Sequence, residues 1–291
     1  MKAEALNELK PDDRTLVDHR TLVLGVRDSG VGGLTVARQL ALALPAARLL
    51  YFADTAHVPY GDKTPAQVRH YALSISEFLI DAGADAVVFA CNTTSAYALD
   101  EARARFQEPV FGVIEPGARA ATAVTHGRIG VLATSATVQS GVFTSTLQRL
   151  NGEILVREVP CPAFVPLIEG RRTQSVEARE ACKHYLAPLL RAEVDTVILG
   201  CTHYPLLLPV MQELAPHLCF VDPAEAVTEE VVAAWRSGSL VAANRHQPNL
   251  HRSAPKARFF VSGPQEGVRE WVEELLPVDE PKLEPGPVFD L

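Results

Sequence analysis

The chain has 291 residues, of which 47% are hydrophobic and 21% charged, as expected of a globular protein with room for two domains. Its 27 Lys and Arg residues against 35 Asp and Glu residues leave a net charge of −8, and no basic stripe stands out, which excludes nucleic-acid binding by charge. Neither a membrane-length apolar run nor a signal peptide is visible, so we predict a cytoplasmic protein without a membrane partner.

The first half of the chain predicts strands that alternate with helices. A polar leader covers residues 1–20, and a Gly-rich turn follows the first strand. Apolar runs predict strands at 21–26, 49–53, 86–89 and 109–114, and amphipathic or Ala-rich segments predict helices at 34–44, 67–82, 95–106 and 118–125. The turn lacks the glycine spacing of a dinucleotide site, so no such cofactor is expected.

The second half repeats this alternation. Strands are predicted at 128–132, 154–159, 195–200, 219–221 and 257–262, and helices at 176–191, 211–214, 224–235 and 266–276, with another ending at Leu150. A polar span covers 237–256 and a Pro-rich tail covers 277–291. Such alternation is typical of parallel α/β layers.

Two pairs of similar segments suggest an internal duplication. Gly25 begins a segment that resembles the one at Gly130, and 130 − 25 = 105 residues; Cys91 and Cys201 each follow an apolar run, and 201 − 91 = 110 residues. We therefore predict an α/β fold with two similar parallel-sheet domains, related by a pseudo-two-fold, and an active site in the cleft between them. The predicted domains are 21–115 plus 228–276 and 116–227.

The cysteine pattern points to reduced thiols. The chain has five cysteines, an odd number, with wide spacing and no CxxC pair. This pattern argues against a disulfide framework and against a metal site. Cys91 and Cys201 each lie where a strand is predicted to stop and a helix to start, and there free backbone N–H groups can lower a thiol pKa and bind an anion. Thr202 is a good helix N-cap for the second of these helices.

Three chemical uses of two facing thiols are open. The first is redox exchange, which requires the two sulfurs to be in contact. The second is a single cysteine nucleophile with His203 as its base, which would suit a hydrolase. Two-base proton transfer at one carbon needs equivalent groups on both faces, which a duplicated fold supplies, and a free thiol with a pKa of about 8.5 can serve as acid or base. Asp28 and His203 are then candidate proton partners, although an isolated Asp or His is more often structural.

Several motifs together resemble the glutamate racemase family. They run nearly the whole length of the chain, from Asp28-Ser29-Gly30-Val31-Gly32-Gly33 through Pro59-Tyr60-Gly61, Cys91-Asn92-Thr93 and Glu115-Pro116-Gly117 to Gly200-Cys201-Thr202-His203. The resemblance implies cofactor-independent interconversion of L- and D-glutamate, which supplies D-glutamate for peptidoglycan, by a homodimer. It also implies that Cys91 is the base toward D-glutamate and Cys201 the base toward L-glutamate.

The resemblance also implies roles for other residues of the site. Asp28, His203, Glu169 and Asp54 match residues that assist catalysis, and the positions that hold substrate are Asp28, Ser29, Pro59, Tyr60, Gly61, Asn92, Thr93, Thr137, Thr202 and His203. No metal is implied. The chain departs from the family at Thr94, where Ala is more usual, a change expected to be harmless, and in its longer leader.

Other functions remain open at this point. An aspartate racemase of the same superfamily would keep both thiols and change the side-chain pocket. A non-catalytic binding protein would keep the fold without turnover, although the presence of both cysteines argues against it. A one-thiol hydrolase would depend on only one of Cys91 and Cys201.

Overall fold

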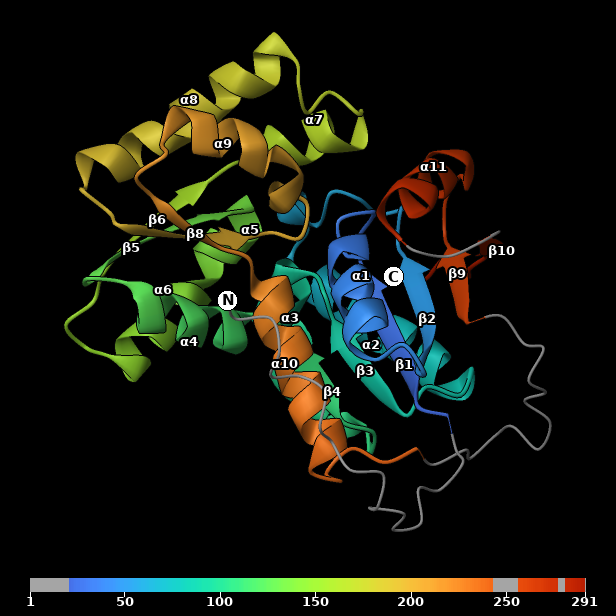
Figure 1. The fold of residues 1–291 in the computed structure, drawn as a ribbon. Helices are drawn as coiled ribbons and strands as arrows, with labels where there is room; N and C mark the ends of the chain where they lie inside the picture. The colour runs from blue at the N-terminus through green and yellow to red at the C-terminus, as the bar shows by residue number, and fades with distance from the viewer. Residues whose placement is uncertain (1–20, 243–255, 277–280, 291) are drawn as a thin grey trace, which may run out of the picture.

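Two parallel sheets form the centre of the protein (Figure 1). The structure is a computed structural model that describes residues 21–242, 256–276 and 281–290. The first sheet has the order β10-β9-β2-β1-β3-β4 and the second the order β6-β5-β7-β8. The strands of the first sheet are β1 (Val23–Asp28), β2 (Arg48–Ala53), β3 (Ala86–Phe89), β4 (Val110–Gly112), β9 (Ala257–Val261) and β10 (Lys282–Pro285), and those of the second are β5 (Arg128–Ala133), β6 (Leu155–Pro160), β7 (Thr196–Gly200) and β8 (Cys219–Val221). The predicted class, two parallel-sheet α/β domains, is confirmed.

The two sheets share one topology. The order β2-β1-β3-β4 in the first matches β6-β5-β7-β8 in the second, and every pairing is parallel. Strands β3 and β7 therefore occupy equivalent places. Cys91 follows β3 and Cys201 follows β7, so the two thiols lie at equivalent strand ends, as the duplication predicts.

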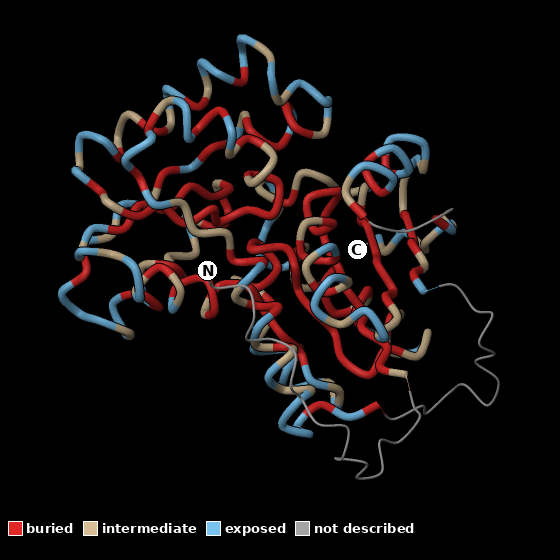
Figure 2. Tube along the Cα trace, viewed as in Figure 1, coloured by how far each residue is buried: buried red, intermediate tan, exposed pale blue. Residues whose placement is uncertain are grey.

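Helices cover both faces of each sheet (Figure 1). In the first domain α1 (Leu34–Ala43) and α11 (Glu266–Leu275) lie on one face and α2 (Pro65–Asp81) and α3 (Asn92–Arg105) on the other; in the second, α4 (Ile114–Val124) and α6 (Val142–Leu150) lie on one face and α8 (Val176–Arg191) and α9 (Leu208–Leu214) on the other. The shorter elements are η1 (Tyr60–Asp62), α5 (Ser135–Ser140), α7 (Phe164–Glu169) and η2 (Tyr204–Leu207). Because both faces are covered, the inner strands β1, β2, β3, β5 and β7 are buried along most of their length (Figure 2), which explains their continuous apolar runs. The edge strands β6 and β10 are largely exposed or half-buried.

The chain leaves the second sheet through α10 (Pro223–Arg236) and returns to the first. This helix packs against α1 and α4, and β9 then pairs with β2. The predicted boundary between 227 and 228 falls inside α10, and the domain limits stay a prediction.

Some elements differ from those predicted. Helix α4 begins at Ile114, so Glu115-Pro116-Gly117 forms its first turn, where proline is tolerated because the first N–H groups have no partner in the helix. The loop predicted around Glu169 contains α7, and the Pro-rich tail contains the edge strand β10, which pairs with β9. The leader 1–20 and residues 243–255 of the polar span lie outside the described residues.

Candidate active site

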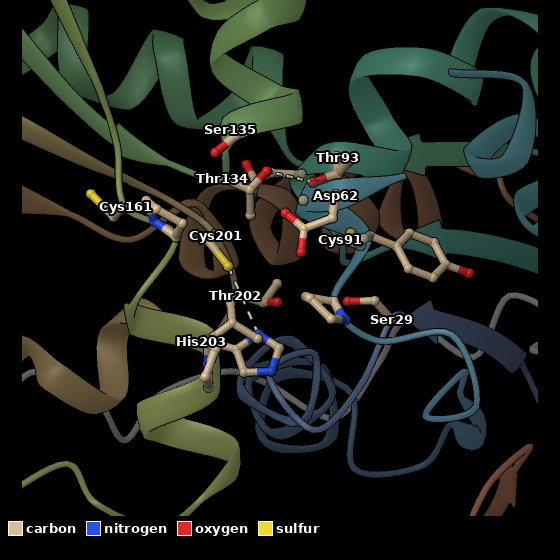
Figure 3. Close-up of a pocket in the computed structure, with 17 residues that line it drawn as sticks. Ser29, Asp62, Cys91, Thr93, Thr134, Ser135, Cys161, Cys201, Thr202 and His203 are labelled. Carbon is tan, nitrogen blue, oxygen red and sulfur yellow. Dashed lines mark hydrogen bonds between the residues drawn. The ribbon is translucent and has the colours of Figure 1, made fainter. Parts of the chain in front are cut away.

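The carboxyl ends of strands from both sheets border one pocket, where ligands bind in open α/β sheets (Figure 3). It encloses about 560 Å³, the open space at its mouth included. Cys91 and Cys201 both line it, although they come from different domains. The pocket is lined by Ser29, Pro59, Tyr60, Gly61, Asp62, Cys91, Asn92, Thr93, Thr134, Ser135, Cys161, Pro162, Val165, Pro166, Cys201, Thr202 and His203.

Cys91 occupies the N-cap position of α3, with an extended backbone, and its residue is only 5% exposed. Burial and then the charge of Asp28 raise the pKa of the Cys91 thiol, whereas the charge of Arg27 and hydrogen bonds from Thr94 act in the opposite direction. The backbone N–H at the helix start does act to lower this pKa, as predicted, but desolvation of the thiolate outweighs it, so the pKa is raised overall.

Cys201 follows β7 and lies beside a histidine. The Cys201 sulfur is 3.8 Å from His203 Nδ1 (Figure 3). The N-cap of η2 is His203, with no side-chain hydrogen bond, so the prediction of Thr202 as a helix cap is wrong. The Thr202 hydroxyl instead donates to Asp28 Oδ1 at 3.2 Å, which joins the two domains.

The buried His203 and the half-buried Glu169 form a pair beside Cys201. Their Nε2 and Oε1 atoms are 2.7 Å apart. Burial alone would lower the pKa of His203, but hydrogen bonds with Cys201 and Glu169 raise it well above its usual value. Burial would raise the pKa of Glu169, yet its hydrogen bond with His203 lowers it. Both shifts favour the charged forms of the pair, an imidazolium and a carboxylate.

Asp28 lies at the end of β1 and is fully buried. Its Oδ2 accepts a hydrogen bond from Gly30 N–H at 3.1 Å, and Oδ1 accepts one from Thr202. Burial raises the pKa of Asp28, and the charge of His203 opposes that effect. Asp28 thus connects the first domain to the Cys201 side of the pocket.

Three hydroxyl groups connect the domains on the Cys91 side. Thr93 Oγ1 lies 2.9 Å from Thr134 Oγ1 and 3.0 Å from Thr137 Oγ1, and the latter two are 2.9 Å apart. Thr93 lies in the first turn of α3, whereas Thr134 caps α5. Thr137 is fully buried behind the two that line the pocket.

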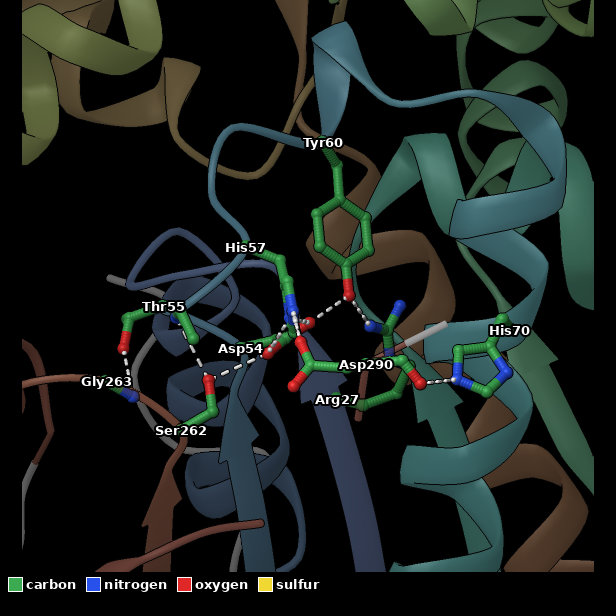
Figure 4. A network of polar contacts seen from close by, with 10 residues as sticks. Arg27, Asp54, Thr55, His57, Tyr60, His70, Ser262, Gly263 and Asp290 are labelled. Carbon is green, nitrogen blue, oxygen red and sulfur yellow. Dashed lines mark hydrogen bonds and ion pairs between the residues drawn. The ribbon is translucent and has the colours of Figure 1, made fainter. Parts of the chain in front are cut away.

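Asp54 belongs to a polar network behind Tyr60 (Figure 4). The Tyr60 hydroxyl donates to Asp54 Oδ2 at 2.5 Å, and the Ser262 hydroxyl donates to Asp54 Oδ1 at 2.7 Å. His57 Nδ1 lies 2.9 Å from both carboxylate oxygens. Arg27 donates to Tyr60 from the opposite side at 3.1 Å, so the tyrosine that lines the pocket is held at its hydroxyl end by buried groups.

Comparison with known proteins identifies the family. Residues 33–231 match the profile described as Asp/Glu/Hydantoin racemase. The chain belongs to this family. The glutamate racemase of Desulforudis audaxviator is 41% identical over 271 residues, which cover 92% of this chain and 97% of the relative, and that of Gloeobacter violaceus is 48% identical over 245 residues, or 83% and 88%.

Solved structures agree with this membership. The crystal structure of the Francisella tularensis glutamate racemase in complex with D-glutamate has a TM-score of 0.83 and 30% identity, and the match covers 92% of this chain and 98% of the other. The protein is thus an isomerase of the amino-acid racemase kind.

The racemase brings most of the predicted site residues to the pocket wall. Ten of them line it: Cys91, Cys201, Ser29, Pro59, Tyr60, Gly61, Asn92, Thr93, Thr202 and His203. Asp28, Asp54, Glu169 and Thr137 lie behind it and contact residues that line it. Their roles stay predictions.

Several residues of the pocket wall were not predicted from the sequence: Asp62, Thr134, Ser135, Cys161, Pro162, Val165 and Pro166. The internal duplication could have indicated Thr134, because Thr134 follows β5 in the second sheet as Ser29 follows the equivalent β1 in the first.

Among the described residues, no cluster of three or more His, Cys, Asp or Glu residues suits a metal ion. Nor does any helix in that part of the chain have the length and apolar character needed to cross a membrane.

The Gly-rich turn after β1 lies against the Cys201 side of the pocket. A Cβ on Gly32 would lie 2.6 Å from Thr202 Oγ1 and 2.7 Å from the backbone nitrogen of His203. We expect Gly32→Ala to displace this segment, to lower the free energy of unfolding by about 1–3 kcal/mol, and to reduce kcat/KM, as measured by urea unfolding and racemisation. Gly267→Ala is the control, because a Cβ there meets nothing within 4 Å; equal effects of both changes would contradict the expectation.

Proposed function

We propose that this racemase interconverts L- and D-glutamate without a cofactor, by two-base proton transfer between Cys91 and Cys201. The observation that carries the proposal is the location of both cysteines, at equivalent strand ends of two similar sheets, on the wall of one pocket. The names of the relatives, and of the D-glutamate complex, support glutamate as the substrate.

The chemistry moves one proton off and another proton on. One cysteine, as thiolate, takes the α-proton of glutamate. The electron pair of the broken C–H bond stays at the α-carbon as a carbanion, which is delocalised onto the α-carboxylate. The other cysteine, as thiol, gives its proton to the opposite face of the carbon. The product is the other enantiomer, and the protonation states of the two cysteines are exchanged. In the L-to-D direction Cys201 is the base and Cys91 the acid.

Substrate binding is assigned to neutral donors. None of the residues that line the pocket is Lys or Arg. The N-terminus of α3 at Asn92 and Thr93 is a site for a carboxylate, because its free N–H groups and the helix dipole favour an anion. The hydroxyls of Ser29 and Thr202, which also line the pocket, supply further hydrogen bonds.

The ionised partners of each thiol complete the proposal. The imidazolium of His203, 3.8 Å from the Cys201 sulfur, stabilises negative charge there and can return a proton after turnover. Asp28 is assigned to the Cys91 side, where its charge raises the Cys91 pKa and its carboxylate can accept a proton from the thiol. We further propose that the enzyme is a cytoplasmic homodimer that supplies D-glutamate for peptidoglycan.

Exchange of the α-proton in heavy water tests the function. We expect the wild-type enzyme to incorporate deuterium at the α-carbon of both glutamate enantiomers as it racemises them, detected by NMR and by chiral chromatography. Aspartate serves as the competing substrate. Turnover of aspartate with none of glutamate would contradict the substrate, and exchange of neither amino acid would contradict the reaction.

A further inference from the structure

Arg171 follows α7 in a backbone conformation that side chains rarely adopt. Its φ is 54°, in the left-handed region. Its N–H donates to the Ile168 carbonyl and the next N–H donates to the Leu167 carbonyl, both at 2.8 Å, which is the pattern of a Schellman motif. Glycine usually occupies this position, whereas here Gly170 lies one residue earlier. The arginine is thus strained, and such strain persists only where surrounding contacts offset it.

The contacts that offset this strain lie in the other domain. Arg171 Nη2 is 2.5 Å from Glu274 Oε2, and Arg171 Nε is 3.6 Å from Glu270 Oε2. The guanidinium carbon lies 4.4 Å from the centroid of the Trp271 ring, close enough for a cation–π interaction. All three partners belong to α11, which packs against α1 of the first domain, whereas α7 packs against α8 of the second (Figure 1). Arg171 therefore ties the two domains together.

The segment that Arg171 anchors carries part of the active site. Two residues of α7 line the pocket, and Glu169 is the last residue of this helix. Glu169 Oε1 lies 2.7 Å from His203 Nε2 and accepts a hydrogen bond from Val31 N–H of the first domain at 3.3 Å. The carboxylate therefore contacts both domains, and it does so two residues before Arg171.

The packing around Glu169 leaves little room for movement. A Cβ on Gly30 would overlap Glu169 Oε1, so the glycine lets the turn after β1 approach the carboxylate closely. Val31 in that turn and Trp271 in α11 belong to the same hydrophobic core cluster as the residues of α7. Because the hydrogen bond from Val31 is already long, a small displacement of the end of α7 would break it.

We propose that Arg171 is an interdomain positioning residue, which holds the end of α7 against α11 and so keeps Glu169 between Val31 and His203. This role rests on the proposed function, in which the pair of Glu169 and His203 supports the Cys201 thiol. An exposed ion pair alone contributes little. Here, however, one helix presents two carboxylates and the face of Trp271, a residue only 5% exposed, to a single guanidinium.

The first test is hydrogen exchange of the α7 amides, followed by mass spectrometry. We expect Arg171→Met, which keeps the unbranched stem and the backbone strain but removes the charge, to speed this exchange by about 3- to 30-fold, because the ion pairs and the cation–π contact are lost. Glu274→Gln speeds it in the same way by a smaller factor, and it keeps the test valid if Arg171→Met fails to fold.

Racemisation kinetics test the connection to Glu169. We expect Arg171→Met to lower kcat/KM for glutamate by about 3- to 30-fold in the otherwise wild-type enzyme. In the Glu169→Gln background the same change lowers it by less than about twofold, because a residue that acts through the Glu169 carboxylate then has nothing left to position. A merely structural role would instead give equal losses in both backgrounds.

Arg179→Met is the matched control. Arg179 Nη1 is 2.7 Å from Glu213 Oε2, and its side chain is 45% exposed, close to the 41% of Arg171. Both members of this pair belong to helices of the second domain, α8 and α9. We expect Arg179→Met to leave α7 exchange and kcat/KM within about twofold of wild type.

The outcomes separate this role from the proposed function. Amide exchange requires no turnover, so unchanged α7 exchange in a folded Arg171→Met enzyme overturns the positioning role alone. Equal losses of kcat/KM with and without Glu169→Gln also overturn it, because Arg171 would then act by another route. A wild-type enzyme that exchanges no glutamate α-proton overturns the proposed function, whatever the α7 amides do.

Discussion

Cys91→Ser and Cys201→Ser each lower glutamate racemisation by at least about 10³-fold, because general acid–base catalysis by a positioned group contributes about 10²–10⁴-fold. A serine hydroxyl is a far weaker acid than a thiol, so it neither forms the anion that takes the α-proton nor replaces it as the donor. Both directions fail together in each variant, since every turnover uses both groups. The measurement is the rate of enantiomer conversion, followed by chiral chromatography.

The single variants keep one-base chemistry, which distinguishes two bases from one nucleophile. Cys201→Ser retains Cys91, so we expect it to exchange the α-proton of D-glutamate for deuterium without inversion, and Cys91→Ser to do the same with L-glutamate. Each also eliminates water from a substrate analogue that carries a leaving group. Cys219→Ser, at an exposed site, is the control. Wild-type racemisation in either Cys91→Ser or Cys201→Ser would contradict the mechanism.

The duplication is what made the site predictable. Local apolar runs indicated the strands, and the similar spacing of two repeated pairs placed both thiols at equivalent strand ends. The order of strands within each sheet could not be predicted, because it depends on which distant segments pair. The motif resemblance then selected residues such as Thr137 and Glu169, which lie behind the pocket wall and contact residues that line it.

Features that depend on tertiary contacts escaped the sequence analysis. Arg27 follows the predicted strand 21–26, and nothing local indicates that it belongs to β1 or that its charge is fully buried. Thr94 accepts a hydrogen bond from Arg27 of β1, a contact between distant segments that only the fold reveals. The raised pKa of Cys91 has the same origin, since local sequence showed the helix start but not the depth of burial.

Glu169→Gln separates the ionic role of the His203 pair from its shape. The neutral amide keeps the size of the side chain but removes the Glu169 charge, which together with Cys201 raises the His203 pKa, so we expect that pKa to fall. The alkaline limb of the pH profile moves to lower pH with it, and racemisation at neutral pH falls by about 10- to 100-fold. His203 ring signals in NMR titrations and pH–rate profiles measure both effects.

The pH dependence of stability follows from the same pair. The raised pKa of His203 contributes stability that is fully present below its unfolded pKa of about 6.5 and is lost as pH rises through the folded value. The lowered pKa of Glu169 contributes stability present above its unfolded pKa of about 4.3 and lost as pH falls through the folded value.

Glu169→Gln therefore lowers the free energy of unfolding mainly between about pH 4.3 and about pH 6.5, the window in which both contributions are fully present. Urea unfolding across the pH range measures the loss. Glu180→Gln, at an exposed pair with Lys183, is the matched control and changes little, because surface ion pairs are screened by solvent. If Glu169→Gln left the His203 titration unchanged, the carboxylate would not be what keeps His203 protonated. The charge beside the Cys201 sulfur would then depend on the sulfur itself, the other hydrogen-bond partner of the ring.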